Sequence, residues 1–386
     1  MKLLKRPIYP ALDAVRFLTA TIVMIYHLFF WKNGDVPDAS QTTDLFWRFG
    51  WVGVEIFFTL SGLVIALSAQ QSTPVKFLID RTVRLAPTIW ICATATLVGT
   101  LALAPSVNVA RLLSDYLWTV ILRPVGDHID IVYWTLTVEI SFYALICFLL
   151  FRSNFRTLVR VLIAVGILST AYDSILALAP YTHAYVPRLT DVVAVSSKFH
   201  LSRLLLLRHG CFFALGVLIW SLKEHSRPKG CLVLIALFFL GGTLEVWYSA
   251  QRQLLDLSTR GLSTSQQLPA VQPVIAWLVG ITLIFLSRLL RAEKMRGGFN
   301  LVSLLRYLGL LTFPIYLLHN NFGMLIEDKI AHFGVGETTA GFAAMIIVLG
   351  ASSLVVSLLE PHLSRALKTI LQKAAARWNR GATEFG

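Results

Sequence analysis

Two ionisable residues, Arg16 and His27, lie inside the first long apolar run of the chain, residues 11–31. At about 100° per residue, the spacing between them corresponds to about three helical turns, so both side chains should lie on one helix face. At about 1.5 Å per residue they should be about 16 Å apart along that face. Asp13 is placed to pair with Arg16 on the same stripe. Because charge in hydrocarbon is costly, this pattern indicates a functional site.

These side-chain types suit two different tasks. A guanidinium binds phosphate through paired charge-assisted hydrogen bonds, and Arg81 and Arg84 could extend such a site around Arg16. An imidazole beside a carboxylate can act as a general base, the carboxylate fixing its tautomer and stabilising the imidazolium. We therefore predict His27 and Glu139 as catalytic residues, with the three arginines binding the phosphates of a substrate.

The elements that must position these residues are membrane helices. The 386-residue chain is 56% hydrophobic and only 14% charged, and apolar runs of about 18 to 22 residues recur along it. The pattern predicts an all-α integral membrane protein, a single polytopic bundle of about ten transmembrane helices. The expected spans are residues 11–31, 51–68, 86–104, 132–151, 158–179, 204–221, 231–249, 271–287, 307–326 and 340–359. The polar stretch 173–203 leaves a short re-entrant segment open as an alternative.

The distribution of Lys and Arg predicts the orientation of this bundle. Cytoplasmic loops are enriched in these residues, and 22 of the 34 fall in the terminal segments and even-numbered loops. Both termini are therefore predicted to be cytoplasmic. The basic segment 1–6 precedes a full-length span without a cleavage site, so the first helix should be retained. We predict a membrane domain over residues 1–360 and a short basic cytoplasmic tail over 361–386.

Alternating helix direction then assigns a depth to each polar residue. The outer half is predicted to hold His27, Glu55, Glu139 and His319, and the inner half Arg16, Arg81 and Arg84. A long donor with phosphates at one end and a reactive group at the other would fit between the two groups. Acyl-coenzyme A has this shape, which makes it the expected co-substrate.

Several other classes of ligand are not indicated. The formal net charge of +13 is spread over every predicted cytoplasmic loop, whereas a nucleic-acid site would gather it into one patch. The cysteines lie in or beside apolar runs at no metal-ligand spacing, which is typical of packing thiols; they are Cys92, Cys147, Cys211 and Cys231. We expect no metal site and no permanently bound cofactor.

Five short motifs follow one another on successive predicted spans. They are Leu12-Asp13-Ala14-Val15-Arg16 with His27; Phe57-Phe58-Thr59-Leu60-Ser61-Gly62; Arg81-Thr82-Val83-Arg84-Leu85-Ala86-Pro87; Trp134-Thr135-Leu136-Thr137-Val138-Glu139-Ile140-Ser141-Phe142-Tyr143; and Tyr316-Leu317-Leu318-His319. Together they resemble the membrane acyltransferase family 3, the integral-membrane O-acyltransferases of bacterial glycans, over nearly the whole chain. The chain departs from the family at Ala14 and Phe17, where glycine is frequent, and at Phe313-Pro314, where a small polar residue is usual.

The resemblance implies a multi-pass enzyme of the bacterial inner membrane. It would move an acyl group, usually acetyl, from cytoplasmic acyl-coenzyme A to a hydroxyl of an extracytoplasmic glycan, such as lipopolysaccharide O-antigen, exopolysaccharide or a lipid-linked sugar. Its partners would be acyl-coenzyme A, the glycan or glycolipid acceptor and the bilayer. The residues expected to support the site are Asp13, Glu55, Ser61, Trp134, Tyr316 and His319.

Other interpretations of the same residues stay open at this point. A proton-coupled secondary transporter could use His27 and Glu139 as a proton relay, but it would not need arginines at one mouth only. Arg81 and Arg84 could be ordinary cytoplasmic charges. Ser61 could be a small helix-contact residue. A non-catalytic scaffold is disfavoured because buried charges would have no reason to persist in it.

Overall fold

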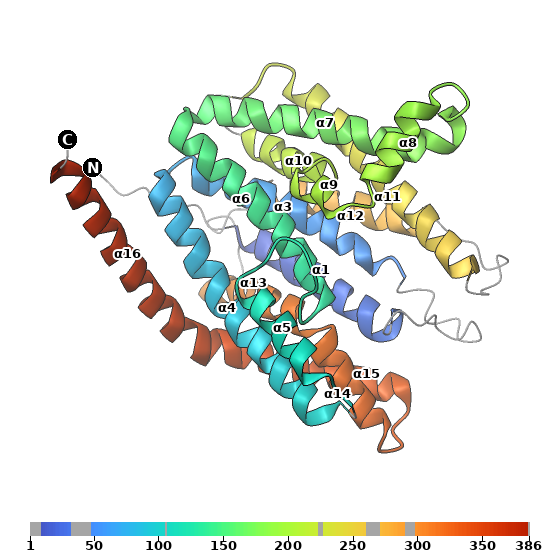
Figure 1. Ribbon diagram of the computed structural model, residues 1–386, viewed down its shortest axis with the longest axis vertical. Helices are drawn as coiled ribbons and strands as arrows, with labels where there is room; N and C mark the ends of the chain where they lie inside the picture. Colours follow the sequence, from blue (N-terminus) through green and yellow to red (C-terminus); the bar gives the residue numbers. More distant parts are fainter. Residues whose placement is uncertain are drawn as a thin grey trace. The chain divides into compact units, whose positions relative to one another are not determined.

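The computed structural model describes residues 9–31, 48–104, 106–222, 227–259, 271–289 and 298–384, which form helices joined by turns and contain no strand (Figure 1). The longer helices are α1 (Pro10–Phe29), α3 (Gly53–Ala69), α4 (Pro74–Leu103), α6 (Trp134–Arg152), α7 (Phe155–Thr182), α11 (Cys231–Thr259), α12 (Val271–Leu289), α13 (Gly298–Leu318), α15 (Glu337–Leu354) and α16 (Glu360–Glu384). The shorter ones are α5 (Val109–Val120), α8 (Pro187–Ser196), α9 (His200–Leu204), α10 (Gly210–Ser221) and α14 (Asn321–Ala331). Single turns η1 (Gly50–Val52) and η2 (Ile131–Tyr133) precede α3 and α6.

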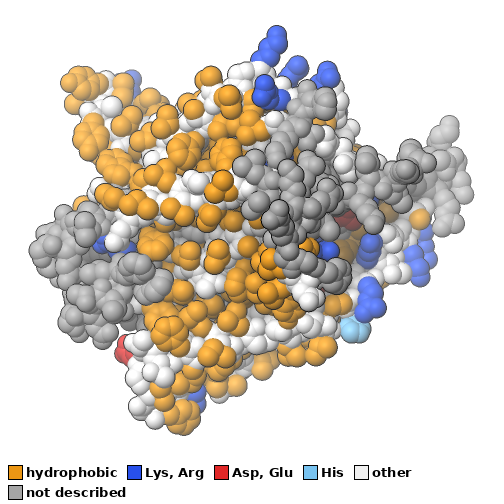
Figure 2. Space-filling model, turned by 180° about the vertical axis from the view of Figure 1, so that it is seen from behind, with side chains coloured by type: hydrophobic (Ala, Val, Ile, Leu, Met, Phe, Trp, Pro, Cys, Tyr) orange, Lys and Arg blue, Asp and Glu red, His pale blue; other side chains and the backbone are white. Residues whose placement is uncertain are grey.

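Nine stretches of the described chain are long and apolar enough to cross a bilayer. Hydrophobic side chains cover much of the described surface that Figure 2 presents, and Lys and Arg gather mainly near its margins. Exposed large apolar side chains on the long helices include Leu18, Val98, Phe148, Leu240 and Ile346. Such a surface suits contact with lipid. In the bilayer core only helices or closed barrels satisfy the hydrogen-bonding groups of the backbone. The predicted polytopic helical fold is therefore confirmed.

The orientation of the termini stays a prediction. Several charges counted for it lie outside the described residues, namely Lys2, Lys5, Arg6, Lys32, Lys223, Arg260, Arg291, Lys294 and Arg296.

The chain forms two compact units. The first comprises Met1–Val64 and Leu162–Tyr316, and the second Ile65–Val161 and Leu317–Gly386. In the first unit α1 packs on η1 and α12, and α11 packs on α10 and α12. In the second unit α4 packs on α5, α6, α14 and α16, and α14 packs on α15. Each unit therefore has its own set of packed helices, and the predicted site residues are divided between the two units.

Helix α4 begins well before the predicted span 86–104. Its first residue is Pro74, and the Thr73 hydroxyl accepts a hydrogen bond from the Lys76 backbone N–H, a typical N-terminal cap. The predicted boundary was wrong because the first three turns of α4 are too polar to count as a membrane span. As a result Arg81 and Arg84 lie inside a helix, whereas a span beginning at residue 86 would leave them outside it.

The predicted sixth span, 204–221, is not one helix. Helix α9 ends at Leu204, and α10 has only 12 residues, about 18 Å against a hydrocarbon core of about 30 Å. Between them Leu206 and His209 adopt left-handed backbone conformations, with φ of 57° and 68°. Neither residue is a glycine, so nothing in the local sequence announces this break.

Two glycines bring α3 and α10 into backbone contact inside the first unit. A Cβ atom added at Gly62 would collide with the Phe213 carbonyl oxygen, and one added at Gly216 would collide with the Thr59 carbonyl oxygen. Small residues at such a crossing allow the helix axes to approach closely. The glycine of the Phe57–Gly62 motif is therefore explained by packing.

Replacing either glycine by alanine should destabilise the protein. Because each new methyl group meets backbone that cannot rotate away, Gly62→Ala and Gly216→Ala should each lower the free energy of unfolding by about 1–3 kcal/mol. Thermal unfolding in detergent would measure this. The control is Gly350→Ala on α15, where an added Cβ meets no described atom within 4 Å and alanine favours the helix. Equal shifts in all three variants would contradict the contact.

The C-terminal helix continues from the last membrane helix. A π-helical turn, Val355–Leu359, joins α15 to α16 without a break, and one helical stretch runs over Glu337–Arg377. The Ser364 hydroxyl donates a hydrogen bond to the Val83 carbonyl of α4 at 3.3 Å. Most of the predicted tail, residues 361–386, is therefore helical, and its beginning packs against α4.

Candidate active site

His27 lies in the last turn of α1, and its tautomer is set within that helix. Its Nδ1 is 3.0 Å from the Val23 carbonyl oxygen. A carbonyl can only accept, so Nδ1 must carry the proton, and Nε2 is the basic nitrogen of the neutral ring. The Tyr26 ring packs edge-on against the imidazole, with centroids 4.9 Å apart. The Val23 carbonyl therefore fixes the tautomer of His27, and the predicted pairing of the ring with a carboxylate stays a prediction.

Arg16 and Asp13 lie near the other end of α1, and both side chains are half-buried. Asp13 packs against α13 at Gly309, where an added Cβ would come within 2.6 Å of the Asp13 Cβ. Helix α1 is uninterrupted from Pro10 to Phe29. The prediction that Arg16 and His27 share one helix is confirmed.

The second unit brings Glu139 together with Arg81 through Tyr143, the last residue of the motif that begins at Trp134. The Tyr143 hydroxyl donates a hydrogen bond to the Glu139 carboxylate. The Arg81 guanidinium lies over the Tyr143 ring at 5.9 Å and over the Phe77 ring at 5.5 Å. Arg84 is close enough for its charge to act on the Tyr143 hydroxyl. An acid, a phenol and two arginines thus form one cluster.

This cluster overturns the predicted difference in depth between Glu139 and Arg81. Helices α4 and α6 pack side by side, and the Cys147 thiol of α6 lies 3.9 Å from the Pro74 carbonyl at the start of α4. From that contact, Arg81 and Glu139 are each about two turns further along, or about 10–12 Å at 1.5 Å per residue. Glu139 and Arg81 therefore lie at one level.

His319 is fully buried at the turn between α13 and α14, and a neighbouring carboxylate holds that turn. Asp130 accepts hydrogen bonds from the Asn320 side-chain amide and the Asn321 backbone N–H, both at 2.8 Å, and from the Val132 N–H at 3.1 Å. Burial raises the pKa of Asp130, while these N–H donors oppose the rise. Sequence reasoning missed Asp130 because its partners lie far along the chain.

Removing the Asp130 carboxylate should destabilise the second unit. Asp130→Ala leaves three N–H groups without their acceptor, and since each costs about 1–3 kcal/mol when buried, the free energy of unfolding should fall by about 3 kcal/mol or more. Chemical unfolding in detergent would measure it. Asp127→Ala is the matched control, because among the described residues that exposed carboxylate pairs with Arg111 at the surface. Similar losses in the two variants would show that Asp130 does not hold the turn.

The remaining predicted site residues occupy the following positions. Tyr316 is buried in the first unit and packs edge-on against Phe57 of α3, with ring centroids 5.8 Å apart. Ser61 is half-buried on α3 beside the glycine crossing, and Trp134 begins α6 in the second unit. Glu55 is buried on α3. The catalytic or binding roles of these residues stay predictions.

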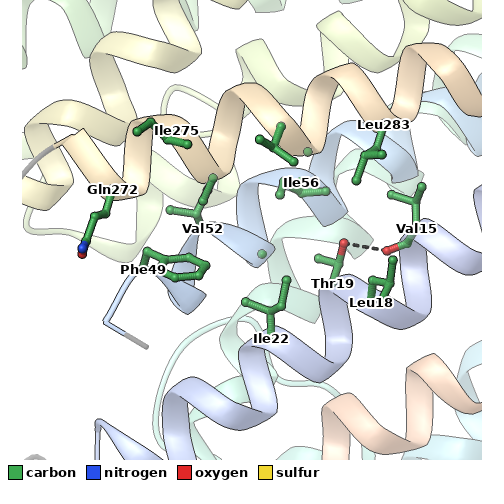
Figure 3. A pocket seen from close by; sticks show the side chains of 14 residues that line it. Val15, Leu18, Thr19, Ile22, Phe49, Val52, Ile56, Gln272, Ile275 and Leu283 are labelled. Carbon is green, nitrogen blue, oxygen red and sulfur yellow. Dashed lines mark hydrogen bonds between the residues drawn. The ribbon is translucent and has the colours of Figure 1, made fainter. Parts of the chain in front are cut away.

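An apolar pocket of about 430 Å³ opens in the first unit between α1, the start of α3 and α12 (Figure 3). Its lining includes Val15, Ile22, Val52, Ile56, Ile275 and Leu283. Of its two polar side chains, Thr19 donates its hydroxyl hydrogen to the Val15 carbonyl, and Gln272 accepts a hydrogen bond from Arg48. The pocket therefore suits a hydrocarbon chain.

Comparison with known proteins places the chain among acyltransferases. It is 32% identical over 114 residues to the exopolysaccharide production protein ExoZ of Rhizobium meliloti, an alignment covering 28% of this chain and 36% of ExoZ. It is 27% identical over 199 residues to the peptidoglycan O-acetyltransferase OatA of Listeria monocytogenes, covering 44% of this chain and 29% of OatA. The chain thus matches about a third of the length of each relative. No solved structure matches it. The model of the acyltransferase domain matches residues 9–359, and the chain therefore belongs to that acyltransferase family.

Proposed function

We propose that this protein is a membrane O-acyltransferase that moves an acyl group, with acetyl as the first candidate, from acyl-coenzyme A to a hydroxyl of an extracytoplasmic glycan. The observation that carries the proposal is the acyltransferase-domain match across residues 9–359. The names of these two relatives, an exopolysaccharide production protein and a peptidoglycan O-acetyltransferase, support a glycan acceptor. The multi-pass helical fold supports a bacterial inner membrane as its place of action.

In this proposal His27 is the general base. Its Nε2 takes the proton from the acceptor hydroxyl as the oxygen attacks the thioester carbonyl carbon. The carbon–sulfur bond then breaks, an ester forms on the sugar, and coenzyme A leaves as a thiolate that takes up a proton. The Nδ1 hydrogen bond to Val23 supports this role because it leaves the basic lone pair on Nε2.

Donor binding is assigned to Arg16, Arg81 and Arg84. The rings under Arg81 support this assignment, because stacking on Tyr143 and Phe77 holds the guanidinium plane in place before phosphate arrives. The apolar pocket beside α1 supports an acceptor that carries a lipid tail. Its walls are almost entirely apolar, so a hydrocarbon chain could bind there without displacing polar contacts.

Sealed vesicles of known orientation would test the function and its direction. With labelled acetyl-coenzyme A on the face predicted to be cytoplasmic, coenzyme A thiol should be released there, and labelled glycan should appear only on the opposite face. The negative control is the His27→Ala protein in matched vesicles. Solute flux coupled to protons without any consumption of acetyl-coenzyme A would favour the transporter alternative. Labelled glycan on the donor side would contradict the proposed direction.

A further inference from the structure

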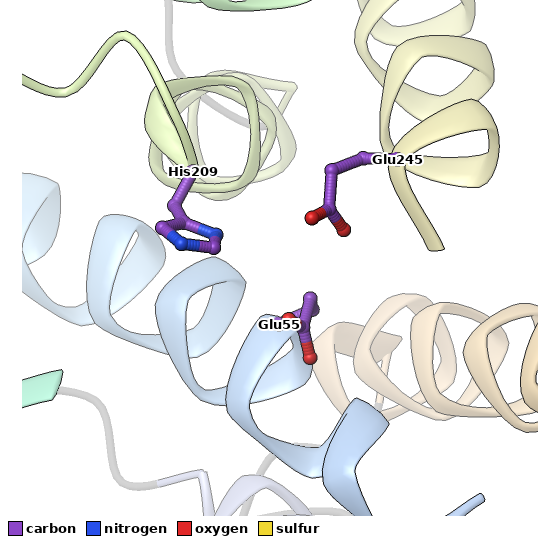
Figure 4. Close-up of side chains that lie close together, drawn as sticks. All are labelled: Glu55, His209 and Glu245. Carbon is purple, nitrogen blue, oxygen red and sulfur yellow. The ribbon is translucent and has the colours of Figure 1, made fainter. Parts of the chain in front are cut away.

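A second group of ionisable side chains is buried in the first unit. The proton transfer and donor binding proposed above do not use it, although it includes Glu55, which the sequence predicts to support the site. Glu55 of α3, His209 at the start of α10 and Glu245 of α11 are 5%, 3% and 1% exposed. Their candidate ligand atoms all lie within 4.8 Å of one another. Figure 4 shows the three side chains converging from their separate segments. Three segments that are distant in the sequence thus meet at one point.

Two carboxylate oxygens in this group lack a hydrogen-bond partner. Glu245 uses its Oε1 fully, accepting from Arg208 Nη2 at 2.8 Å and from the Ser249 hydroxyl at 2.9 Å. Its Oε2 and the Glu55 Oε2 are buried without any donor among the described residues. A buried carboxylate oxygen without a hydrogen-bond donor is unfavourable in free energy. The arrangement therefore contains two strong acceptors that could bind a cation or a donor.

The charges around the group are not balanced by the arginine that contacts it. Asp173 is a third buried carboxylate acting on the same group, and it too has an oxygen without a donor among the described residues. Arg208 forms an ion pair with Glu245, and Arg203 also acts on His209 from nearby. A buried acid that is ionised without compensation is strongly disfavoured, and a bound cation would supply the compensating charge for the acid oxygens that these guanidiniums do not contact.

The donor atoms are those of a transition-metal site. One imidazole nitrogen with two carboxylate oxygens is a three-ligand set that suits Zn²⁺ and similar ions, with a further position left for water. The backbone at His209 is also strained, because this residue adopts the left-handed conformation with φ of 68°. Such strain concentrates at functional sites, where the surroundings enforce it.

We propose that Glu55, His209 and Glu245 bind one divalent transition-metal ion that joins α3, the α9–α10 loop and α11. The site goes beyond the proposed acyl transfer and does not depend on it. It would correct the expectation from sequence that the protein has no metal. The Gly62–Phe213 and Gly216–Thr59 contacts fix α3 against α10, which holds Glu55 and His209 in register.

Zinc binding by the purified full-length protein tests the site. After treatment with a chelator and removal of free metal, the protein should take up one Zn²⁺ per chain. The midpoint of thermal unfolding should rise by several degrees when Zn²⁺ is present at about 100 times its dissociation constant. Co²⁺ in place of Zn²⁺ should give visible absorption bands without a thiolate band. Absence of stoichiometric Zn²⁺ and of any thermal shift in the native sequence would overturn the proposal without recourse to variants.

Variants then locate the ion. Glu55→Gln, Glu245→Gln and His209→Gln should each weaken Zn²⁺ binding at least tenfold, because each removes one of three ligands. The controls are Glu327→Gln, which changes a buried acid of the second unit, and Cys211→Ser, which changes a nearby thiol. Both should bind Zn²⁺ like the native protein. Equal binding in all five variants, or loss of binding only in Cys211→Ser, would place the ion elsewhere and overturn the assignment.

Discussion

Replacing His27 by alanine should abolish acyl transfer while acyl-coenzyme A still binds. The change removes the basic Nε2 that the Val23 hydrogen bond orients, and general-base catalysis typically contributes about 10²- to 10⁴-fold. The turnover rate should therefore fall by about that factor. Acetyl transfer in vesicles measures the rate, and equilibrium binding of labelled acetyl-coenzyme A measures the donor affinity.

His362→Ala is a matched control for this experiment. His362 has the same local arrangement, with its Nδ1 2.7 Å from the carbonyl oxygen four residues before it, but it is exposed on α16. Its loss should leave the turnover rate unchanged. Full turnover in the His27→Ala protein would show that another group takes the proton.

Replacing Arg16 by lysine should weaken donor use, although the charge is kept. Lysine lacks the planar fork that binds phosphate at two points, and a charged hydrogen bond is worth about 1.5–3 kcal/mol, so KM for acyl-coenzyme A should rise about 10- to 100-fold. Arg81→Lys should show a smaller rise, since Arg84 shares the binding of the donor phosphates with Arg81 in this proposal. Steady-state kinetics with varied donor concentration would measure both.

Arg111→Lys provides the reference for this series, because Arg111 is exposed and pairs only with surface acids in the described structure. Its KM should equal that of the native protein. If Arg16→Lys and Arg81→Lys also leave KM unchanged, both arginines are ordinary topology charges, and the donor phosphates bind elsewhere.

The sequence was a good guide wherever the chemistry lies on one helix. Arg16 and His27 could be assigned to a single span because both length and hydropathy define it. The tautomer of His27 was not foreseen, since the hydrophobic pattern carries no information about which acceptor meets Nδ1. The start of α4 was misplaced, although Thr73 and Pro74 form a recognisable helix start, because membrane hydropathy was given more weight than local capping.

Contacts between distant segments were beyond the reach of the sequence. Glu245 stands as a single acid in the seventh apolar run, which is a signal that could have singled it out. Its meeting with Glu55 and His209 depends on how three helices pack. The left-handed residues Leu206 and His209 also carry no sequence mark, so the stretch that contains them was predicted as one span.

The helix that continues past α15 has a practical consequence for expressing this protein. The Ser364 hydroxyl of α16 donates a hydrogen bond to the carbonyl of Val83, the neighbour of Arg84. The Glu360 carboxylate interacts electrostatically with the Arg84 guanidinium. Removing the chain immediately after the last membrane turn would therefore remove the contacts of α16 with α4. It would also alter the surroundings of Arg84, a predicted donor-binding residue. A shortened version intended for crystallisation should therefore keep α16 beyond Ser364, and purification tags belong after that part of the helix.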